Sequence, residues 1–371
     1  MPTQPAKIRW PDGVLVRVAF ITVGDTGRKT GGYLYNERVI SVLRQRGLEI
    51  EEVVAGGTSP DEQRTSAPRL GSTFDPSRFD TIVVDALARI AVAPHLDRWQ
   101  AFRPVVALVH ELPDVAGGGA GSETVARERD YEEPLLRADR LVAVSDHGKY
   151  VLRGRGVSPG RIHVVPPGFD RVPAGDGSPV QRGGPVRALC VAQWIPRKGI
   201  LTLVEAWKLR ERKGAVLELI GETNADPDYA ARVRAAIDAA PQGSIVESGC
   251  VGDASLGATY ASADLFVLPS RYEGYGIVYA EALAFGLPII ACDAGPVPDL
   301  VGREAAVLVR PDDKEALSAA LGLLLGDPSL RLRMSAAASR RASRLPRWED
   351  TVAGFEQVLR TAAETRKSEP M

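Results

Sequence analysis

Residues 269–295, PSRYEGYGIVYAEALAFGLPIIACDAG, follow the order glycine loop, helix, strand, and the rest of the chain can be understood from them. The apolar run at 264–268 (DLFVL) just before this segment is typical of a buried strand. Apolar residues at helical spacing predict a helix over 277–285, and Gly286-Leu287-Pro288 predicts its end. The run at 287–292 predicts the next buried strand. This alternation of strands and helices is typical of a parallel α/β sheet.

Two glycines and two carboxylates make this segment a candidate ligand site. Gly274 and Gly276 leave the backbone uncovered, and the first N–H groups of a helix have no partner within it. With the positive end of the helix dipole, these groups predict a phosphate site. A phosphate would repel Glu273 and Glu281, so we expect both to accept hydrogen bonds from the diols of a sugar and a ribose. The alternative is a surface loop followed by a solvent-exposed helix glutamate.

The motif EGYGIVYAE at 273–281, followed by AFGLPIIACDAGPVPDLVG, resembles the signature of glycosyltransferase family 4, whose members are retaining enzymes. The resemblance implies an α/β protein of the GT-B fold. Such a protein has two Rossmann-like domains facing across a cleft and a C-terminal helix that crosses back to the first domain. The resemblance also implies that Glu281 holds the nucleotide ribose. The donor sugar would be held by Glu273 and by the backbone that follows it, at Gly274, Tyr275, Gly276 and Ile277.

Bulk properties fit an intracellular two-domain globular protein. The 371 residues suit two domains, and a content of 44% hydrophobic and 25% charged residues is typical of globular proteins. A net charge of −1 argues against a nucleic-acid binder. Cys190, Cys250 and Cys292 are isolated, which predicts reduced core thiols in a cytoplasmic protein. No signal peptide is visible, and no apolar run approaches the roughly 18 residues that cross a bilayer.

The predicted N-terminal domain, residues 1–172, begins with a strand at 14–23 and a helix at 33–46, joined by a glycine loop. The loop is not a P-loop, because Arg28 separates Gly27 from Lys29. In the resembled family, a Gly-Gly pair at this helix start faces the donor diphosphate, which implies that role for Gly31 and Gly32. A plain tight turn is the alternative. Further strands are predicted at 48–54, 81–85, 105–109, 140–145 and 161–165.

His110 directly follows the predicted strand at 105–109, and ligands of parallel sheets bind at the carboxyl ends of strands. The resemblance implies contact between this side chain and the transferred sugar; a histidine that caps a loop is the alternative. His110 also begins an HExxH pattern, but Asp114 stands at its last position, so a zinc site is not predicted. Loops are predicted at 56–80 and at 114–133, and because GT-B enzymes usually bind the acceptor on this domain, we expect the acceptor there.

A linker is predicted at 173–184, a C-terminal domain at 185–345, and a crossover helix with a tail at 346–371. In the C-terminal domain, Arg197 and Lys198 lie between a strand at 186–192 and a helix at 201–212. Two cations in such a loop suit a diphosphate leaving group without a metal; the alternative is a solvated basic turn. The resemblance implies that Glu222 and Val251 lie near the ribose and the base, where backbone groups read the base, so uracil and guanine both stay open.

The sequence thus predicts transfer of a sugar from a nucleoside diphosphate donor with retention of configuration. A UDP-hexose is favoured on family frequency, with His110, Arg197, Lys198 and Glu273 as catalytic residues and no metal cofactor. The acceptor is an unidentified small molecule or glycoconjugate, and the sequence names no oligomeric state. One alternative is a non-catalytic protein of the GT-B fold that binds a nucleotide sugar. A sugar phosphorylase of the same fold is another.

Overall fold

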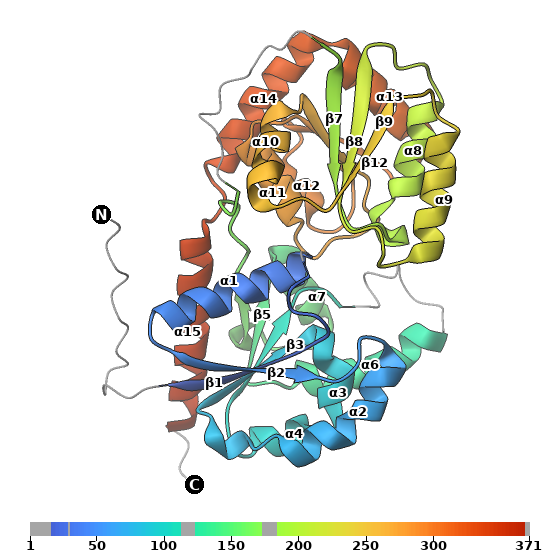
Figure 1. Cartoon of the computed structure of the whole chain (residues 1–371). Helices are drawn as coiled ribbons and strands as arrows, with labels where there is room; N and C mark the ends of the chain where they lie inside the picture. Colours follow the sequence, from blue (N-terminus) through green and yellow to red (C-terminus); the bar gives the residue numbers. More distant parts are fainter. Residues whose placement is uncertain (1–15, 29, 113–122, 173–183, 368–371) are drawn as a thin grey trace. The chain divides into compact units, whose positions relative to one another are not determined.

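The computed structural model describes residues 16–28, 30–112, 123–172 and 184–367. Contacts divide the chain into two units (Figure 1). Unit 1 comprises Met1–Pro167 and Glu349–Met371, and unit 2 comprises Gly168–Trp348. The predicted linker at 173–184 lies, except for Gly184, outside the described residues, so the boundaries placed from it stay predictions.

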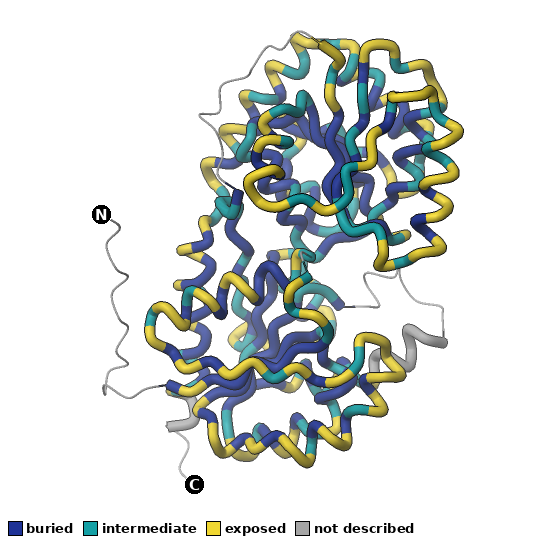
Figure 2. The backbone as a smooth tube through the Cα atoms, viewed as in Figure 1, coloured by how far each residue is buried: buried dark blue, intermediate teal, exposed yellow. Residues whose placement is uncertain are grey.

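Unit 1 is built on a six-stranded parallel sheet in the order β2-β1-β3-β4-β5-β6. All residues of its central strands β3 and β4 are buried, which explains why β4 is apolar throughout and why β3 is apolar between Thr81 and Asp85. Figure 2 shows these strands in the dark blue of buried residues, with exposed residues on the outer sides of the helices. The strands are β1 (Arg17–Val23), β2 (Glu49–Ala55), β3 (Thr81–Asp85), β4 (Val105–Val109), β5 (Arg140–Ala143) and β6 (Ile162–Val164).

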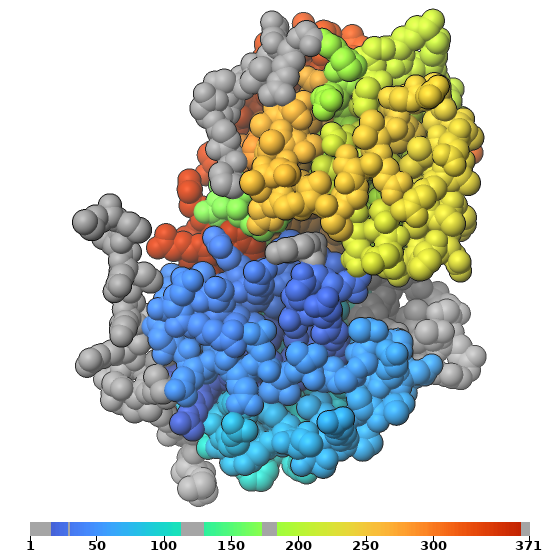
Figure 3. Space-filling model, in the orientation of Figure 1, coloured from blue at the N-terminus to red at the C-terminus, as the bar shows by residue number. Residues whose placement is uncertain are grey.

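The helices of the first segment of unit 1 are α1 (Gly31–Gln45), α2 (Pro60–Thr73), α3 (Arg89–Val92), α4 (Leu96–Gln100), α6 (Glu123–Leu136) and α7 (Asp146–Gly154). Short 3-10 turns lie at Pro76–Arg78, Ala86–Ala88, Ala93–His95 and Pro159–Arg161. In Figure 3 the visible face of this unit is formed mainly by the blue N-terminal segments, which include α1 and the edge strand β2.

The prediction of a loop over residues 56–80 was wrong, because most of this segment forms α2. Ser59 caps the helix: its hydroxyl accepts from the backbone N–H of Glu62 (3.3 Å), and the Glu62 carboxylate accepts from the N–H of Ser59 (3.0 Å). Only three side chains of α2 are buried, so the apolar periodicity that marks a helix is weak here. The predicted loop at 114–133 was wrong from Glu123 onward, where α6 begins; its glycine-rich part, 117–121, lies outside the described residues.

Unit 2 contains a second six-stranded parallel sheet, in the order β12-β11-β10-β7-β8-β9. Its strands are β7 (Val186–Val191), β8 (Ala215–Ile220), β9 (Ile245–Gly249), β10 (Leu265–Leu268), β11 (Ile289–Cys292) and β12 (Ala306–Val309). Its helices are α8 (Ile200–Lys208), α9 (Pro227–Asp238), α10 (Asp253–Ser262), α11 (Ile277–Ala284), α12 (Val297–Val301), α13 (Lys314–Gly326) and α14 (Pro328–Ala342), with a 3-10 turn at Pro196–Lys198. The sequence patterns did not predict α10 and α12.

The C-terminal helix α15 (Trp348–Lys367) returns the chain to unit 1, as predicted. Its Thr351 hydroxyl donates to the carbonyl of Pro166 (2.8 Å), and Glu356 pairs with Arg46 (3.2 Å). Val352 and Phe355 on the same helix are almost completely buried. Among the helices of the described residues, none combines the length and apolar character needed to cross a membrane.

The prediction that all three cysteines are core thiols was wrong for Cys250. Cys190 and Cys292 are buried, but Cys250 is exposed. It directly follows β9, which is an edge strand of the sheet, and a residue just past an edge strand has no neighbouring strand to cover it.

Candidate functional site

The turn that carries Arg197 and Lys198 is packed directly against the end of β10. Gly199, which ends the turn and caps α8, has a φ of 69°. A Cβ atom at this position would lie 2.3 Å from the carbonyl oxygen of Pro269, so both the conformation and the space require glycine. This close approach brings the two cations of the turn to the segment that follows β10.

Lys198 and Glu273 form the centre of a buried charged cluster. Nζ of Lys198 lies 2.7 and 2.8 Å from the two carboxylate oxygens of Glu273, and Nη1 of Arg197 lies 3.7 Å from the carboxylate. The Ser270 hydroxyl donates to the same carboxylate (2.6 Å). Burial raises the pKa of Glu273, but the two cations and the hydrogen bonds outweigh burial and leave that pKa below its usual value. The structure therefore brings together three of the four residues predicted to be catalytic, with Glu273 ionised.

The glycine loop leads from this cluster into α11. Gly276 caps the helix with a φ of 97°, and a Cβ atom there would lie 2.6 Å from the ring of Tyr279. The hydroxyl of Tyr279 donates to the carbonyl of Leu268 at the end of β10 (2.7 Å), which fixes the first turn of the helix on the sheet. The N–H groups at Ile277 and beyond therefore begin next to Glu273, at a helix end suited to an anion.

Glu281, inside α11, is completely buried and held by two partners that the sequence did not indicate. Nε and Nη2 of Arg171 lie 2.9 and 2.7 Å from its Oε1, and the Tyr260 hydroxyl donates to its Oε2 (3.0 Å). Nη1 of Arg171 also binds Asp253 (2.7 Å). Burial raises the pKa of Glu281, and the nearby Arg171 charge offsets this only in part. Arg171 lies 110 residues before Glu281 in the chain, so no local spacing could have revealed the pair.

Glu222 and Val251 follow the ends of β8 and β9. The Gln193 amide donates to the Glu222 carboxylate (2.7 Å), and the Trp194 N–H donates to the Glu222 carbonyl (2.8 Å). Val251 is partly buried, two residues before Asp253. Because Asp253 shares Arg171 with Glu281, the segment that contains Val251 lies near the buried carboxylate.

In unit 1, His110 lies at the end of β4 against the start of α1. A Cβ atom on Gly32 would lie 3.3 Å from the imidazole ring, so the predicted Gly31-Gly32 pair and His110 are neighbours. Nε2 of His110 lies 3.2 Å from the Oδ1 of Asn36, one turn further along α1. The His110 side chain is 14% exposed. Burial lowers its pKa, and the charges of two nearby carboxylates oppose this only in part, so the ring is neutral at pH 7.

The sequence analysis missed Asn36 and Asp85, which support His110. Nδ2 of Asn36 donates to the Asp85 carboxylate (2.5 Å), and Asp85 is completely buried at the end of β3. The signal that could have found Asp85 is its position, because it ends a buried strand beside the one that His110 follows.

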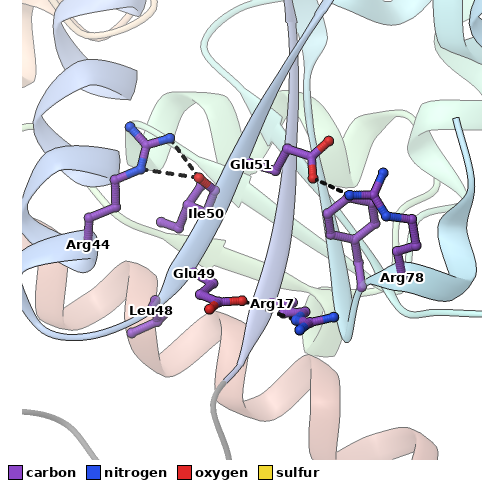
Figure 4. Close-up of a pocket in the computed structure, with 8 residues that line it drawn as sticks. Arg17, Arg44, Leu48, Glu49, Ile50, Glu51 and Arg78 are labelled. Atoms are coloured by element: carbon purple, nitrogen blue, oxygen red, sulfur yellow. Dashed lines mark hydrogen bonds and ion pairs between the residues drawn. The ribbon is translucent and has the colours of Figure 1, made fainter.

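Two other features of the described residues give no sign of a ligand site. A hollow of about 490 Å³ lies beside β2 and is lined by Arg17, Arg44 and Arg78 (Figure 4). Each of these arginines is already paired with a glutamate, so the hollow presents no unpaired cation of its own to an anionic ligand. The Asp-Pro-Asp sequence at 226–228 is a helix start: the Asp226 carboxylate accepts from the N–H of Tyr229 (2.9 Å).

Two known families match this chain, one over each half. The family described as Glycosyltransferase Family 4 matches residues 31–172, and the family described as Glycosyl transferases group 1 matches residues 178–341. An MMP α-(1→4)-mannosyltransferase of Mycolicibacterium hassiacum is 33% identical over 265 residues, which are 64% of this chain and 62% of the relative. The chain therefore spans less than two thirds of that relative's length.

Solved structures show the same fold. Sucrose-phosphate synthase from Thermosynechococcus elongatus has a TM-score of 0.80 at 22% identity, covering 94% of this chain and all of that one. Anabaena HepE in complex with UDP and glucose has a TM-score of 0.73 at 18% identity, covering 95% of this chain and all of that one. The two parallel sheets are thus the two Rossmann-like domains of the GT-B fold. With both halves matched by glycosyltransferase families, the chain belongs to glycosyltransferase family 4.

Proposed function

We propose that the protein transfers a hexose from a nucleoside diphosphate sugar to an acceptor hydroxyl, with retention of configuration. The observation that carries the proposal is the buried Lys198–Glu273 cluster at the start of α11, with the buried Glu281 further along the same helix. A helix start with two adjacent cations suits a diphosphate, and two buried carboxylates suit the diols on either side of it.

Each residue has one role in this proposal. Arg197, Lys198 and the backbone N–H groups from Gly274 to Ile277 stabilise the negative charge that develops on the leaving diphosphate. Glu273 accepts hydrogen bonds from the transferred sugar, and Glu281 from the ribose. Glu222 and Val251 lie on the nucleoside side of the donor site. For unit 1 we propose the roles that the family resemblance implies: Gly31 and Gly32 for the donor diphosphate, and His110 for the transferred sugar.

In the reaction, the bond between the anomeric carbon and the diphosphate breaks, and a bond to the acceptor oxygen forms while the acceptor loses its proton. Retention follows if the acceptor approaches on the face that the diphosphate leaves. Catalysis then consists of positioning and charge stabilisation, which need no covalent intermediate. We propose that no metal takes part, so EDTA should leave the rate unchanged.

A UDP-hexose is the favoured donor. Its support is the family resemblance together with HepE, a protein of the same fold whose structure contains UDP and glucose. The mannosyltransferase relative is the reason to test GDP-mannose beside the UDP-sugars. A thermal-shift screen of UDP- and GDP-sugars identifies the donor, and turnover of the best one against candidate acceptors tests transfer.

Two variants test the site. Glu273→Ala should mainly lower kcat, by about 10²-fold or more, because it removes a group that positions the reacting sugar. Glu281→Ala should mainly raise the KM for the donor, by about tenfold, which is about 1.4 kcal/mol of binding. Glu304→Ala is the matched control, because Glu304 is an exposed glutamate (87% of its side chain) that pairs with Arg340 and precedes β12. Full activity in either test variant would contradict the proposed roles.

The two alternatives have their own tests. A non-catalytic binding protein would bind the donor without hydrolysing it. A transferase, in contrast, hydrolyses its donor slowly when no acceptor is present. A sugar phosphorylase would accept inorganic phosphate as the acceptor and release a sugar phosphate.

A further inference from the structure

A buried polar chain connects Asp85 to His110 below the start of α1. The Asp85 carboxylate accepts from the Leu87 N–H on Oδ1 (2.9 Å) and from the amide of Asn36 on Oδ2 (2.5 Å), where the Thr22 hydroxyl also donates (3.1 Å). Asp85 is 0% exposed and Asn36 is 4% exposed. These polar groups are therefore shielded from water. The direction of each hydrogen bond depends only on which of the two groups can donate and which can accept.

The hydrogen bonds that link Asp85, Asn36 and His110 can run in only one direction. A carboxylate only accepts, so the NH₂ group of Asn36 must face Asp85. The Asn36 carbonyl then faces Nε2 of His110 at 3.2 Å, and a carbonyl also only accepts. Nε2 must therefore carry the proton. In a neutral imidazole the other nitrogen, Nδ1, is then a bare acceptor.

We propose that Asp85 and Asn36 are positioning residues that lock His110 in the Nε2–H tautomer, so that Nδ1 can offer a ligand only a hydrogen-bond acceptor. The Nε2 bond is the one ring-nitrogen hydrogen bond found for His110 among the described residues, which leaves Nδ1 as the nitrogen for substrate.

This has a consequence for donor specificity, which rests on the proposed role of His110 beside the transferred sugar. A group that meets Nδ1 must donate a hydrogen bond. A hexose hydroxyl does so, whereas the carboxylate of a hexuronic acid has no proton to donate at neutral pH and would meet the nitrogen lone pair. The Asp85–Asn36–His110 relay thus selects neutral hexose donors against uronic acid donors.

The tautomer can be observed directly in the free protein. The chain has 4 histidines, so a two-bond ¹⁵N–¹H spectrum of ¹⁵N-histidine-labelled protein contains few signals, and a His110→Gln variant assigns the one of interest. We expect the downfield signal of an unprotonated nitrogen at Nδ1 of His110. An unprotonated Nε2 at pH 7, or protons on both nitrogens, would overturn the proposal.

Asp85→Asn should invert the tautomer. The new amide keeps its carbonyl toward the Leu87 N–H and turns its NH₂ group toward Asn36, which must flip to accept from it. The flipped Asn36 then donates to Nε2 of His110, and the imidazole proton moves to Nδ1. The matched control is Asp139→Asn, the same change at a carboxylate that accepts from Val105 on the same sheet; it should leave His110 as in the wild type.

A folded Asp85→Asn protein with an unchanged tautomer would overturn the relay. If that variant does not fold, the wild-type spectrum decides alone, because the direction of these hydrogen bonds requires a protonated Nε2 and an unprotonated Nδ1.

Activity supplies the second readout. The wild type should prefer a UDP-hexose to the matching UDP-hexuronic acid, as measured by the ratio of the two kcat/KM values. Asp85→Asn should reduce this ratio by about tenfold or more, because Nδ1–H of His110 can then donate a hydrogen bond to the carboxylate of the uronic acid. An unchanged ratio in a variant whose tautomer has inverted would refute the specificity consequence. If no nucleotide sugar is turned over at all, the proposed function fails, while the spectrum still decides the relay.

Discussion

Glu273 and Glu281, the two most deeply buried carboxylates of the candidate donor site, both lie beside cations. Glu273 has Lys198 and Arg197, and Glu281 has Arg171. Burying a charge is costly unless it is paired and hydrogen-bonded, so these pairs lower the cost of holding both acids in the interior. The two acids differ in the balance: the cations prevail at Glu273, whose pKa is lowered, and burial prevails at Glu281, whose pKa is raised.

Glu281 has little acceptor capacity left for a ribose. A carboxylate offers about four acceptor positions, and Arg171 and Tyr260 fill three of them. A ribose diol needs two. If Glu281 holds the ribose as proposed, Arg171 must release at least one position, and Asp253 can retain the guanidinium when it does so.

Arg171→Met should make nucleotide affinity depend on pH. Without the guanidinium, the already raised pKa of Glu281 rises further. A protonated carboxyl loses acceptor positions, so the affinity for UDP should fall as the pH is lowered through that pKa. The fall should begin at a higher pH than in the wild type, as calorimetry at a series of pH values would show.

Arg171→Lys keeps the charge and is the matched variant, with a pH profile close to that of the wild type. The raised pKa also fixes the sign for stability: the folded state holds the Glu281 proton more tightly than the unfolded state, so this residue's contribution declines as the pH rises through the folded pKa. Identical pH profiles for Arg171→Met and the wild type would show that Arg171 does not control Glu281.

At the scale of elements, the site depends on a turn that has no room for a side chain. The turn at Pro196–Lys198 lies against the carboxyl end of β10, and Gly199 is the point of closest approach. The Arg-Lys-Gly pattern thus combines two functions. Its cations are the ones proposed to bind the diphosphate, and its glycine lets the turn approach the end of the strand.

Gly199→Ala should be more harmful than Gly214→Ala, although the two glycines have nearly the same φ, 69° and 71°. A Cβ at Gly214 meets nothing within 4 Å, so its cost should be that of the left-handed conformation, about 1–2 kcal/mol. At Gly199 the contact with Pro269 adds to that cost and shifts Lys198, so kcat should fall as well.

Urea midpoints and kcat of both variants measure the difference. Equal destabilisation, with wild-type kcat in Gly199→Ala, would mean that the close approach does not hold the cluster in place.

At the scale of the whole molecule, unit 1 is assembled from two distant segments of the chain. Helix α15 supplies Phe355, which is 1% exposed and has its ring 6.3 Å from that of Tyr35 in α1. The helix is therefore part of the core of unit 1, where it packs against α1.

Phe355→Ala should destabilise unit 1 by about 3–5 kcal/mol, the range for removing a buried aromatic ring. Hydrogen exchange should accelerate in β1 and α1, while β7 and β8 of unit 2 serve as an internal control. Leu323→Ala, which removes an exposed apolar side chain (49%), should change the stability by no more than about 0.5 kcal/mol. Equal acceleration in both units would contradict this assignment of α15.

The sequence alone predicted the strands and their parallel direction, and it named the residues of unit 2 that the structure brings together. A strand buried on both faces is mostly apolar, and Arg197, Lys198, Glu273 and Gly276 lie in the two short segments that follow β7 and β10, neighbouring strands of one sheet. Helix α2 was missed because its evidence is a capping box at Ser59 rather than an apolar stripe. Local sequence patterns therefore predict strands and short motifs, which depend only on residues close together in the chain.

Only the tertiary structure decided which side chains hold the site residues. Arg171 reaches Glu281 over 110 positions, and Asn36 is joined to Asp85 over 49 and to His110 over 74. These partners come from different elements, so no periodicity links them in the sequence. Each pair exists because a buried polar group must find a partner wherever the folded chain provides one, and that requirement is satisfied in space rather than along the chain.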